Sequence, residues 1–291
     1  MNRFLGVHLS RIPASVRALA ALVGIIALLA AGCGTGARGE SEGKTTIVRI
    51  AGSTTILPVA TVVAEMYEKT HPSARIEVQG GGSSVGIESV RTGVVDIGMS
   101  SRDVKDDEKE GLTIIPIAYD AIAVIVNPSN PVTSISTEDL AKIFSGEITN
   151  WKDVGGRDEE IILVNRDEAS GTREAFSKMI MKERDFTKRA VIQPGTGQVR
   201  SIVENTPAAI GYISLQYAND RVKVLALDGV RPTLETIADG TYPMVRKLYF
   251  LTRGTPSESA QAFIEYILSD EVQEKVVGKM FVPIKAVEKT R

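Results

Sequence analysis

The stretch Asn165-Arg166-Asp167-Glu168-Ala169-Ser170-Gly171-Thr172-Arg173 lies between an apolar run, residues 161–164, and a run with helical character, residues 174–181. This change of pattern places Ser170, Gly171 and Thr172 at the first turn of a helix. Backbone N–H groups of a first turn have no partner within the helix and carry the positive end of its dipole. Two hydroxyls and a glycine there, with Arg166 upstream, are typical of an anion-binding turn. Ser and Thr also favour this place as ordinary helix caps, so this segment alone leaves both interpretations open.

Comparable turns occur elsewhere in the chain. Ala51-Gly52-Ser53-Thr54-Thr55 leads into a helix near Pro58, and Gly80-Gly81-Gly82-Ser83-Ser84 leads into a short helix that ends at Arg91. A fourth segment, residues 96–103, adds hydroxyls and an arginine after a short apolar run. One such turn is weak evidence, but three that each open a helix predict an anion site. A turn at Gly195-Thr196-Gly197 is either a further ligand loop or only the start of a helix.

The body of the chain alternates between short apolar strands and helical patterns, which predicts an α/β fold with largely parallel sheets. Ligands in such folds bind beyond the strand ends, where helix N-termini converge. Ser136-Thr137-Glu138-Asp139 resembles a capping box that opens a helix to Phe144. Thr255-Pro256-Ser257-Glu258 is expected to open the last long helix, in which apolar residues recur at helical spacing. The predicted strands are 47–51, 75–79, 112–117, 121–126, 222–227 and 247–251.

Two segments have the character of crossings between lobes. The strand 121–126 ends in the rigid turn Asn127-Pro128-Ser129-Asn130-Pro131, and Tyr242-Pro243 precedes the strand that carries the chain back. We therefore expect a first lobe made of residues 44–126 and 247–291, and a second lobe made of residues 127–246.

The N-terminus has the character of an export signal. Residues 1–32 contain three arginines, no acidic residue and an apolar core too short for a typical membrane span. The core ends in Ala30-Ala31-Gly32-Cys33, which resembles a bacterial lipobox, and Cys33 is the only cysteine of the chain. We expect lipid attachment at Cys33 (ordinary cleavage with a spare thiol is the alternative) and a flexible tether over residues 33–43.

Charge narrows the choice of partners. Without residues 1–32 the chain has 31 Lys and Arg against 36 Asp and Glu, a formal charge of −5. A mildly acidic protein with no basic block is not expected to bind nucleic acid, and any bound anion has to be captured by local groups.

The polar turns resemble the phosphate-binding proteins that serve the Pst-type phosphate ABC transporter of bacteria. The resemblance extends over most of the exported chain, and its most specific motif is Arg166, three residues, then Ser170-Gly171-Thr172. It implies a type II periplasmic-binding-protein fold with two α/β lobes joined by two hinge strands that close on phosphate. It also implies hydroxyl, N–H and guanidinium donors in the site and a charge-assisted contact from Arg166. The implied ligand residues are Thr54, Thr55 (through its N–H), Ser83, Ser101, Arg166, Ser170, Gly171 and Thr172.

Ser101 departs from the pattern of this family, in which better-known members have an aspartate that accepts the proton of hydrogen phosphate and repels sulfate. Asp103, Asp167 or Glu168 is a possible replacement, whereas Arg102 would weaken the discrimination. Sulfate and molybdate are therefore alternative ligands. Sensing of phosphate without delivery is an alternative role.

An enzyme is the remote alternative. Gly82-Ser83-Ser84-Val85-Gly86 matches a nucleophile elbow with Ser84 as nucleophile, but the only histidine after the signal, His71, precedes it in the chain. With one histidine and scattered carboxylates we expect no metal and no cofactor. The sequence thus predicts a monomeric solute-binding lipoprotein at the outer face of the cell membrane or in the periplasm, with transmembrane permease subunits as its partner.

Overall fold

The computed structural model describes residues 45–288. The predicted signal peptide over residues 1–32, the lipid site at Cys33 and the tether over residues 33–43 lie outside the described residues. Within residues 45–288, no helix combines the length and the apolar character that a membrane crossing requires.

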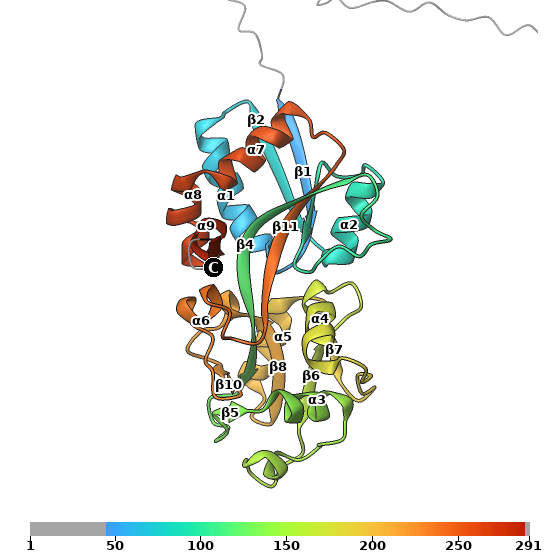
Figure 1. Ribbon diagram of the computed structural model, residues 1–291, viewed down its shortest axis with the longest axis vertical. Coiled ribbons are helices and arrows are strands. Elements are labelled where there is room, and N and C mark those ends of the chain that lie inside the picture. The colour runs from blue at the N-terminus through green and yellow to red at the C-terminus, as the bar shows by residue number, and fades with distance from the viewer. Residues whose placement is uncertain (1–44, 289–291) are drawn as a thin grey trace, which may run out of the picture. The chain divides into compact units, whose positions relative to one another are not determined.

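The first lobe is a parallel βαβ layer. Its central strand β1 pairs in parallel with β2 on one side and with β3 on the other. The buried faces of β1 and α1 form one apolar core with α7, because Val48 and Ile50 alternate along β1 while Val59 and Val63 recur at helical spacing. Figure 1 shows this group of elements in the upper half of the ribbon. Its elements are β1 (Thr46–Gly52), α1 (Leu57–Thr70), β2 (Ala74–Gly80), α2 (Ser83–Arg91), β3 (Ile97–Ser100), α7 (Glu258–Leu268) and α8 (Asp270–Lys275).

The second lobe repeats the parallel arrangement around β6, which pairs with β7 and β8. Its core is separate and gathers the aromatic side chains of Phe144, Phe176 and Tyr212, of which Phe176 and Tyr212 stack with ring centroids 4.2 Å apart. Its elements are β5 (Ser134–Ile135), α3 (Thr137–Ser145), β6 (Ile162–Arg166), α4 (Gly171–Phe176), β7 (Val191–Gln193), α5 (Thr196–Asn205), β8 (Ala209–Ser214), β9 (Lys223–Val224), β10 (Ala226–Leu227) and α6 (Leu234–Ala238), with short helical turns at Trp151–Val154, Ser177–Met181 and Leu215–Tyr217.

Two long antiparallel strands, β4 (Leu112–Val126) and β11 (Val245–Arg253), run through both lobes (Figure 1). β4 pairs with β11 as far as Ala121 and then with β8 from Ile122 onward. The sequence predicted two separate strands, 112–117 and 121–126, and this was wrong because the hydrogen-bonded ladder continues across the gap. The last short elements, Val277–Lys279, β12 (Val282–Pro283) and α9 (Ile284–Glu288), return to β4 through the pairing of β12.

The hinge strands make the sheet less parallel than the alternating pattern predicted. All pairings of β4 and β11 are antiparallel, whereas the pairings of β1 and β6 are parallel. The predicted strand 222–227 is divided into β9 and β10, which pair with different strands.

The predicted helix starts are confirmed. Ser136 Oγ accepts from Asp139 N at the start of α3, and Ser257 Oγ accepts from Ala260 N at the start of α7. The limits of the lobes, 44–126 with 247–291 and 127–246, stay a prediction.

Candidate functional site

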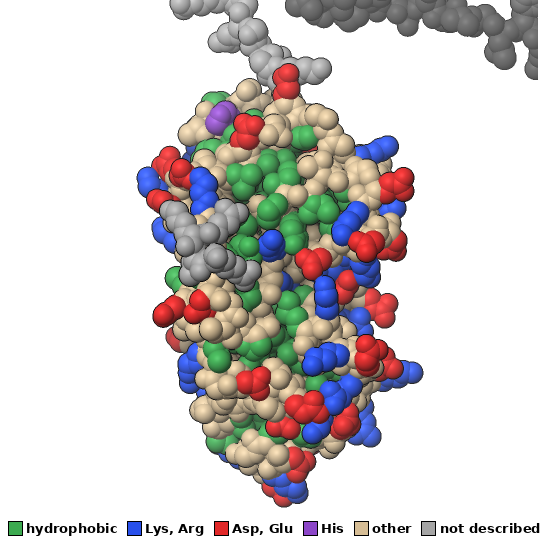
Figure 2. Space-filling model, viewed as in Figure 1, with side chains coloured by type: hydrophobic (Ala, Val, Ile, Leu, Met, Phe, Trp, Pro, Cys, Tyr) green, Lys and Arg blue, Asp and Glu red, His purple; other side chains and the backbone are tan. Residues whose placement is uncertain are grey.

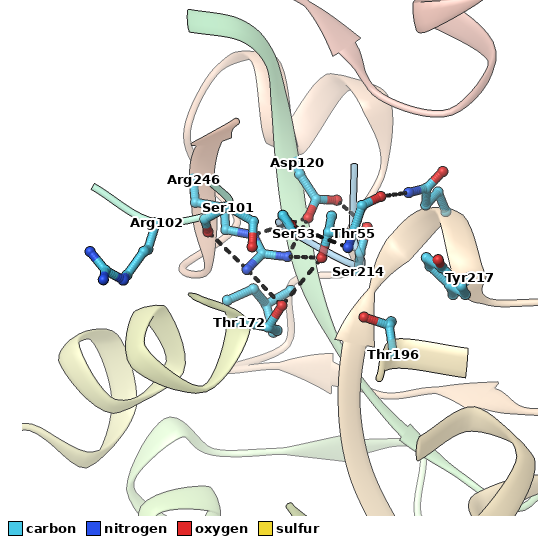
Figure 3. Close-up of polar contacts among 12 residues, drawn as sticks. Ser53, Thr55, Ser101, Arg102, Asp120, Thr172, Thr196, Ser214, Tyr217 and Arg246 are labelled. Carbon is cyan, nitrogen blue, oxygen red and sulfur yellow. Dashed lines mark hydrogen bonds and ion pairs between the residues drawn. The ribbon is translucent and has the colours of Figure 1, made fainter. Parts of the chain in front are cut away.

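Four helix N-termini, two from each lobe, meet where the paired hinge strands β4 and β11 pass between the lobes. α1 follows Thr54 and Thr55, and α2 begins at Ser83, both in the first lobe. α4 begins at Gly171 and α5 at Thr196, both in the second lobe. Figure 3 shows the hydroxyls of Thr55, Thr172 and Thr196 in this region. Helix starts from both lobes bring positive dipole ends to one place, which suits a multi-oxygen anion, although at α1 the N–H groups of residues 55–57 already donate to Ser53.

Arg166, at the end of β6, forms one corner of the site. Its side chain is 2 % exposed, and its Nη1 and Nη2 donate to Thr196 Oγ1 at 3.2 Å and to Thr54 Oγ1 at 3.4 Å. The remaining contacts are to the carbonyls of Gln193 and Pro194. Burial lowers the pKa of Arg166, although the guanidinium stays protonated at neutral pH. Among residues 45–288, no carboxylate lies within ion-pair distance of it.

Arg246, on β11, forms a second corner that the sequence did not predict. Its Nη2 and Nη1 donate to Thr55 Oγ1 at 3.2 Å and to Thr172 Oγ1 at 3.0 Å. Unlike Arg166, it has a carboxylate partner, because Asp120 Oδ2 accepts from Nε at 3.0 Å and from Nη2 at 2.8 Å (Figure 3). Asp120 Oδ1 accepts from Ser214 Oγ at 2.7 Å. Burial raises the pKa of Asp120, and the bonds from Arg246 and Ser214 oppose that rise.

Ser83, Ser101 and Gly171 form the third corner. Ser83 Oγ accepts from Ser101 N at 3.0 Å and lies 3.2 Å from Ser101 Oγ. A Cβ atom on Gly171 would lie 2.2 Å from Ser83 Oγ, so the two lobes touch here with no space for a further carbon. Gly82 is as close to the opposite lobe, because its Cβ would lie 2.5 Å from the carbonyl oxygen of Ala169.

Two predicted ligand groups have another partner in this structure. Ser170 Oγ caps α4 by accepting from Arg173 N at 3.1 Å, which is the ordinary cap that the sequence left open and which leaves its own O–H available. The N–H of Thr55 donates to Ser53 Oγ at 3.2 Å, whereas its hydroxyl lies in the site.

The charged residues after Ser101 do not enter the site. Arg102 points away from the cluster (Figure 3), and its guanidinium lies 2.7 Å from Glu108 and 2.9 Å from Glu174. Asp103 accepts from Tyr249 Oη at 2.8 Å and lies 3.4 Å from Lys178 Nζ. The charge of Arg102 is thus already paired, and neither it nor Asp103 supplies the function expected of position 101.

Of the other two candidates for that function, Glu168 is exposed, while Asp167 is partly buried with an Oδ1 that has no hydrogen-bond partner.

Known proteins resemble this chain over most of its length. A family model described as a PBP superfamily domain matches residues 39–271. The phosphate-binding protein PstS of Bacillus subtilis is 34% identical over 287 residues, which cover 93% of this chain and 94% of that protein. The chain belongs to the PstS family of phosphate-binding proteins.

Solved PstS-like structures share the fold. A phosphate ABC transporter substrate-binding protein from Clostridium perfringens, solved with bound phosphate, is 38% identical with a TM-score of 0.80 and is matched over 82% of this chain and all of that one. An ABC-type phosphate transport receptor from Vibrio cholerae is 32% identical with a TM-score of 0.69, over 81% of this chain and 99% of that one. The fold predicted from the sequence, a two-lobed binding protein with two hinge strands, is confirmed.

Residues outside the PstS motifs complete the cluster. Thr196 belongs to the turn that the sequence left open as a ligand loop, and its hydroxyl lies 3.3 Å from that of Thr54. Tyr217 Oη donates to the carbonyl of Thr54 at 2.7 Å, and Gln216 donates to that of Thr55, so the turn after β8 joins the lobes. Burial raises the pKa of Tyr217 to about 12, which keeps it a donor at neutral pH.

A lone carboxylate inside an apolar strand is seldom buried without a cationic partner, and this signal could have identified Asp120.

The residues of the hydrolase alternative have other contacts. Ser84 Oγ accepts from Arg102 Nη2 at 3.3 Å. His71 lies at the far end of α1, where its ring stacks on Tyr67 with centroids 4.0 Å apart.

Proposed function

We propose that this protein binds inorganic phosphate between its two lobes and delivers it to the permease of an ABC transporter. The observation that carries the proposal is the meeting of four helix N-termini around two buried arginines. Each arginine donates to two threonine hydroxyls, one from each lobe. A tetrahedral anion with several oxygens can use donors from both sides at once, and binding then favours the closed arrangement.

Each residue of the proposed site has a defined task. Arg166 provides charge and directed N–H donors, and the hydroxyls of Thr54, Thr55, Ser83, Ser101 and Thr172 donate to the phosphate oxygens. Gly171 and Thr172 add the free N–H groups of the first turn of α4, and Ser170 adds its O–H while it caps that helix. The protein makes and breaks no bond in this cycle, and the closed form is what the permease recognises.

The anchoring part of the proposal is carried by the sequence. Lipid at Cys33 would hold a monomer at the outer face of the cell membrane or in the periplasm, with residues 34–43 as tether. We expect Cys33→Ala to move the protein from the membrane fraction to the soluble fraction. Retention of the variant in the membrane fraction would contradict lipid attachment at this residue.

With serine at position 101, sulfate is a competing ligand of the proposed site. A serine hydroxyl, unlike an aspartate, does not repel an anion that has no proton to donate. Ser101 is buried and its hydroxyl lies at the third corner of the site.

The decisive experiment is calorimetric titration of ligand-free protein with phosphate, repeated with sulfate present. Phosphate binding with one site per chain, reduced at least tenfold in Arg166→Met, would support the proposal. Phosphate binding that sulfate displaces would keep the site and change the proposed selectivity. Absence of phosphate binding to the folded wild-type protein would refute the proposal.

A further inference from the structure

We propose that Arg246 is a positioning residue of the anion site: held in place by Asp120, its guanidinium orients the hydroxyls of Thr55 and Thr172 so that both donate to the ligand. This rests on the proposed function, since it concerns the same anion. The family motif consists of Arg166 and the first turn of α4. Arg246 and Asp120 lie outside this motif, on the hinge strands β11 and β4.

The position of the pair is fixed by the fold. Arg246 and Asp120 are directly opposite each other in the ladder between β11 and β4. The pairing with β11 ends one residue further along β4, at Ala121, and the next residue, Ile122, pairs with Ser214 of β8. The guanidinium therefore lies where β4 passes from its pairing with β11 to its pairing with β8, and it contacts residues of both lobes there.

The contacts of Arg246 go beyond what an ion pair within a strand ladder requires. Nη1 also donates to the carbonyl of Ser101 at 3.0 Å, so the side chain contacts the ends of three elements that carry proposed ligands: Thr55 before α1, Ser101 after β3 and Thr172 in α4. The residue is 5 % exposed, and the flat fork of a guanidinium is the geometry that satisfies several acceptors at fixed angles.

The chemistry of arginine determines the direction of the hydroxyl bonds. Arginine has five N–H donors and no acceptor, so the oxygens of Thr55 and Thr172 must accept from it. Each hydroxyl then keeps its single O–H for another acceptor. The two oxygens lie 3.3 Å apart, so in this arrangement one O–H is directed at the other hydroxyl. An anion placed beside them replaces that one contact and receives two oriented donors.

Asp120 stabilises the buried guanidinium of Arg246 before the ligand binds. A buried guanidinium with no counter-charge is destabilising, and Asp120 with its bond from Ser214 compensates that charge without entering the cluster of hydroxyls. The carboxylate thus acts as a positioning residue, and the guanidinium is the group that faces the ligand residues.

The test is a double-mutant cycle on phosphate affinity, measured by calorimetry on the full-length protein. Arg246→Lys keeps a positive charge for Asp120 but has no planar fork, and Thr172→Val removes one hydroxyl. We expect Arg246→Lys to lose about tenfold in affinity. We also expect Thr172→Val to lose clearly less affinity in the Arg246→Lys background than in the wild type, because the hydroxyl is no longer oriented. The matched control is Arg253→Lys, an exposed arginine on the same strand, which should bind like the wild type.

A second variant covers the case in which Arg246→Lys fails to fold. Asp120→Asn combined with Arg246→Met removes both charges together, so neither charge is left buried without its partner, and the amide oxygen can still accept from Ser214 Oγ. This variant should fold and still lose at least tenfold in phosphate affinity.

The outcomes distinguish a failure of this inference from a failure of the proposed function. If the wild type binds phosphate and Arg246→Lys or the double replacement binds equally well, or if the cycle is additive, Arg246 has only a structural role and this inference falls alone. If the folded wild type does not bind phosphate, the proposed function falls and this inference with it.

Discussion

Arg166 and Arg246 are both buried, and each donates to two threonine hydroxyls, one from each lobe. Their other partners differ. Arg166 has only hydroxyls and the carbonyls of Gln193 and Pro194 within bonding distance, whereas Arg246 has the carboxylate of Asp120. Burial lowers the pKa of both guanidinium groups, and in Arg246 the charge and hydrogen bonds of Asp120 oppose the effect.

The difference indicates two ways to keep a cation in a dry site. Arg166 has no carboxylate that neutralises its charge. An anion that binds beside it is therefore attracted by the whole positive charge of a weakly hydrated guanidinium. Arg246 is compensated in advance, so its position is set before the ligand arrives. One arginine therefore mainly supplies affinity, and the other mainly supplies geometry.

The largest expected effect is on stability and separates the two arginines. Arg246→Met leaves Asp120 buried without its partner, and we expect the free energy of unfolding of the ligand-free protein to fall by about 3–5 kcal/mol. Arg166→Met leaves no buried carboxylate behind and should lose much less. Denaturant titration of both variants makes the comparison, and equal losses would show that the two arginines have the same structural role.

The second effect is on affinity. Arg166→Met should lose at least tenfold in phosphate affinity, since at least one charge-assisted hydrogen bond disappears. Calorimetry measures this, with Arg231→Met, an exposed arginine of the second lobe, as control. Affinity within twofold of the wild type would remove Arg166 from the site.

A third arginine sharpens the contrast, because Arg102 is bound by carboxylates on two sides and lies outside the site. The hydrogen bond from Arg102 holds the pKa of Glu108 below its ordinary value of 4.5. The ionised Glu108 therefore stabilises the folded protein at pH values above the ordinary pKa of 4.5. This contribution to the free energy of unfolding is lost as the pH falls through the lowered pKa of Glu108 in the folded protein. Unfolding measured in acid should therefore show a weaker loss of stability in Glu108→Gln than in the wild type, by less than about 1 kcal/mol. Identical acid profiles would contradict this.

The smallest effect concerns the ion pairs between the lobes. Glu174 of α4 lies 2.9 Å from Arg102 and 3.4 Å from Lys105 of the first lobe. In Figure 2, Lys and Arg side chains alternate with acidic ones along the side of the molecule that carries α2 and α4. Because such partly exposed pairs are weak and screened by salt, Glu174→Gln should reduce phosphate affinity only about two- to threefold at low salt and less at high salt. Glu235→Gln, exposed on α6, is the control, and a tenfold loss would show that closure depends on these pairs.

The sequence predicted the parts of the site that are local. A strand, a run of Gly, Ser and Thr, and a helix in succession identify Thr54, Thr55, Ser83, Gly171 and Thr172, because each helix start brings its own donors. The structure brings these residues together, and their roles as ligands stay a proposal.

The rest depends on pairing between distant strands. Arg246 is 191 residues from Thr55 along the chain and 126 from Asp120. It lies within a strand, where no turn or cap marks it, so only the register of β4 against β11 brings it to the site. The prediction of two strands in place of β4 was wrong for a related reason. The gap between the two predicted strands, residues 118–120, contains Asp120, which interrupts the apolar pattern, but neighbouring strands pair with the gap and with both sides of it.

Gly82 has a consequence for how the protein could be altered. At this position a single added carbon would collide with the backbone of Ala169 in the opposite lobe, while every proposed ligand residue would remain unchanged. Lobe closure therefore depends on at least one residue that takes no part in the proposed anion recognition. We expect a methyl group at Gly82 to produce a protein that still captures its ligand in the open arrangement but does not close fully around it.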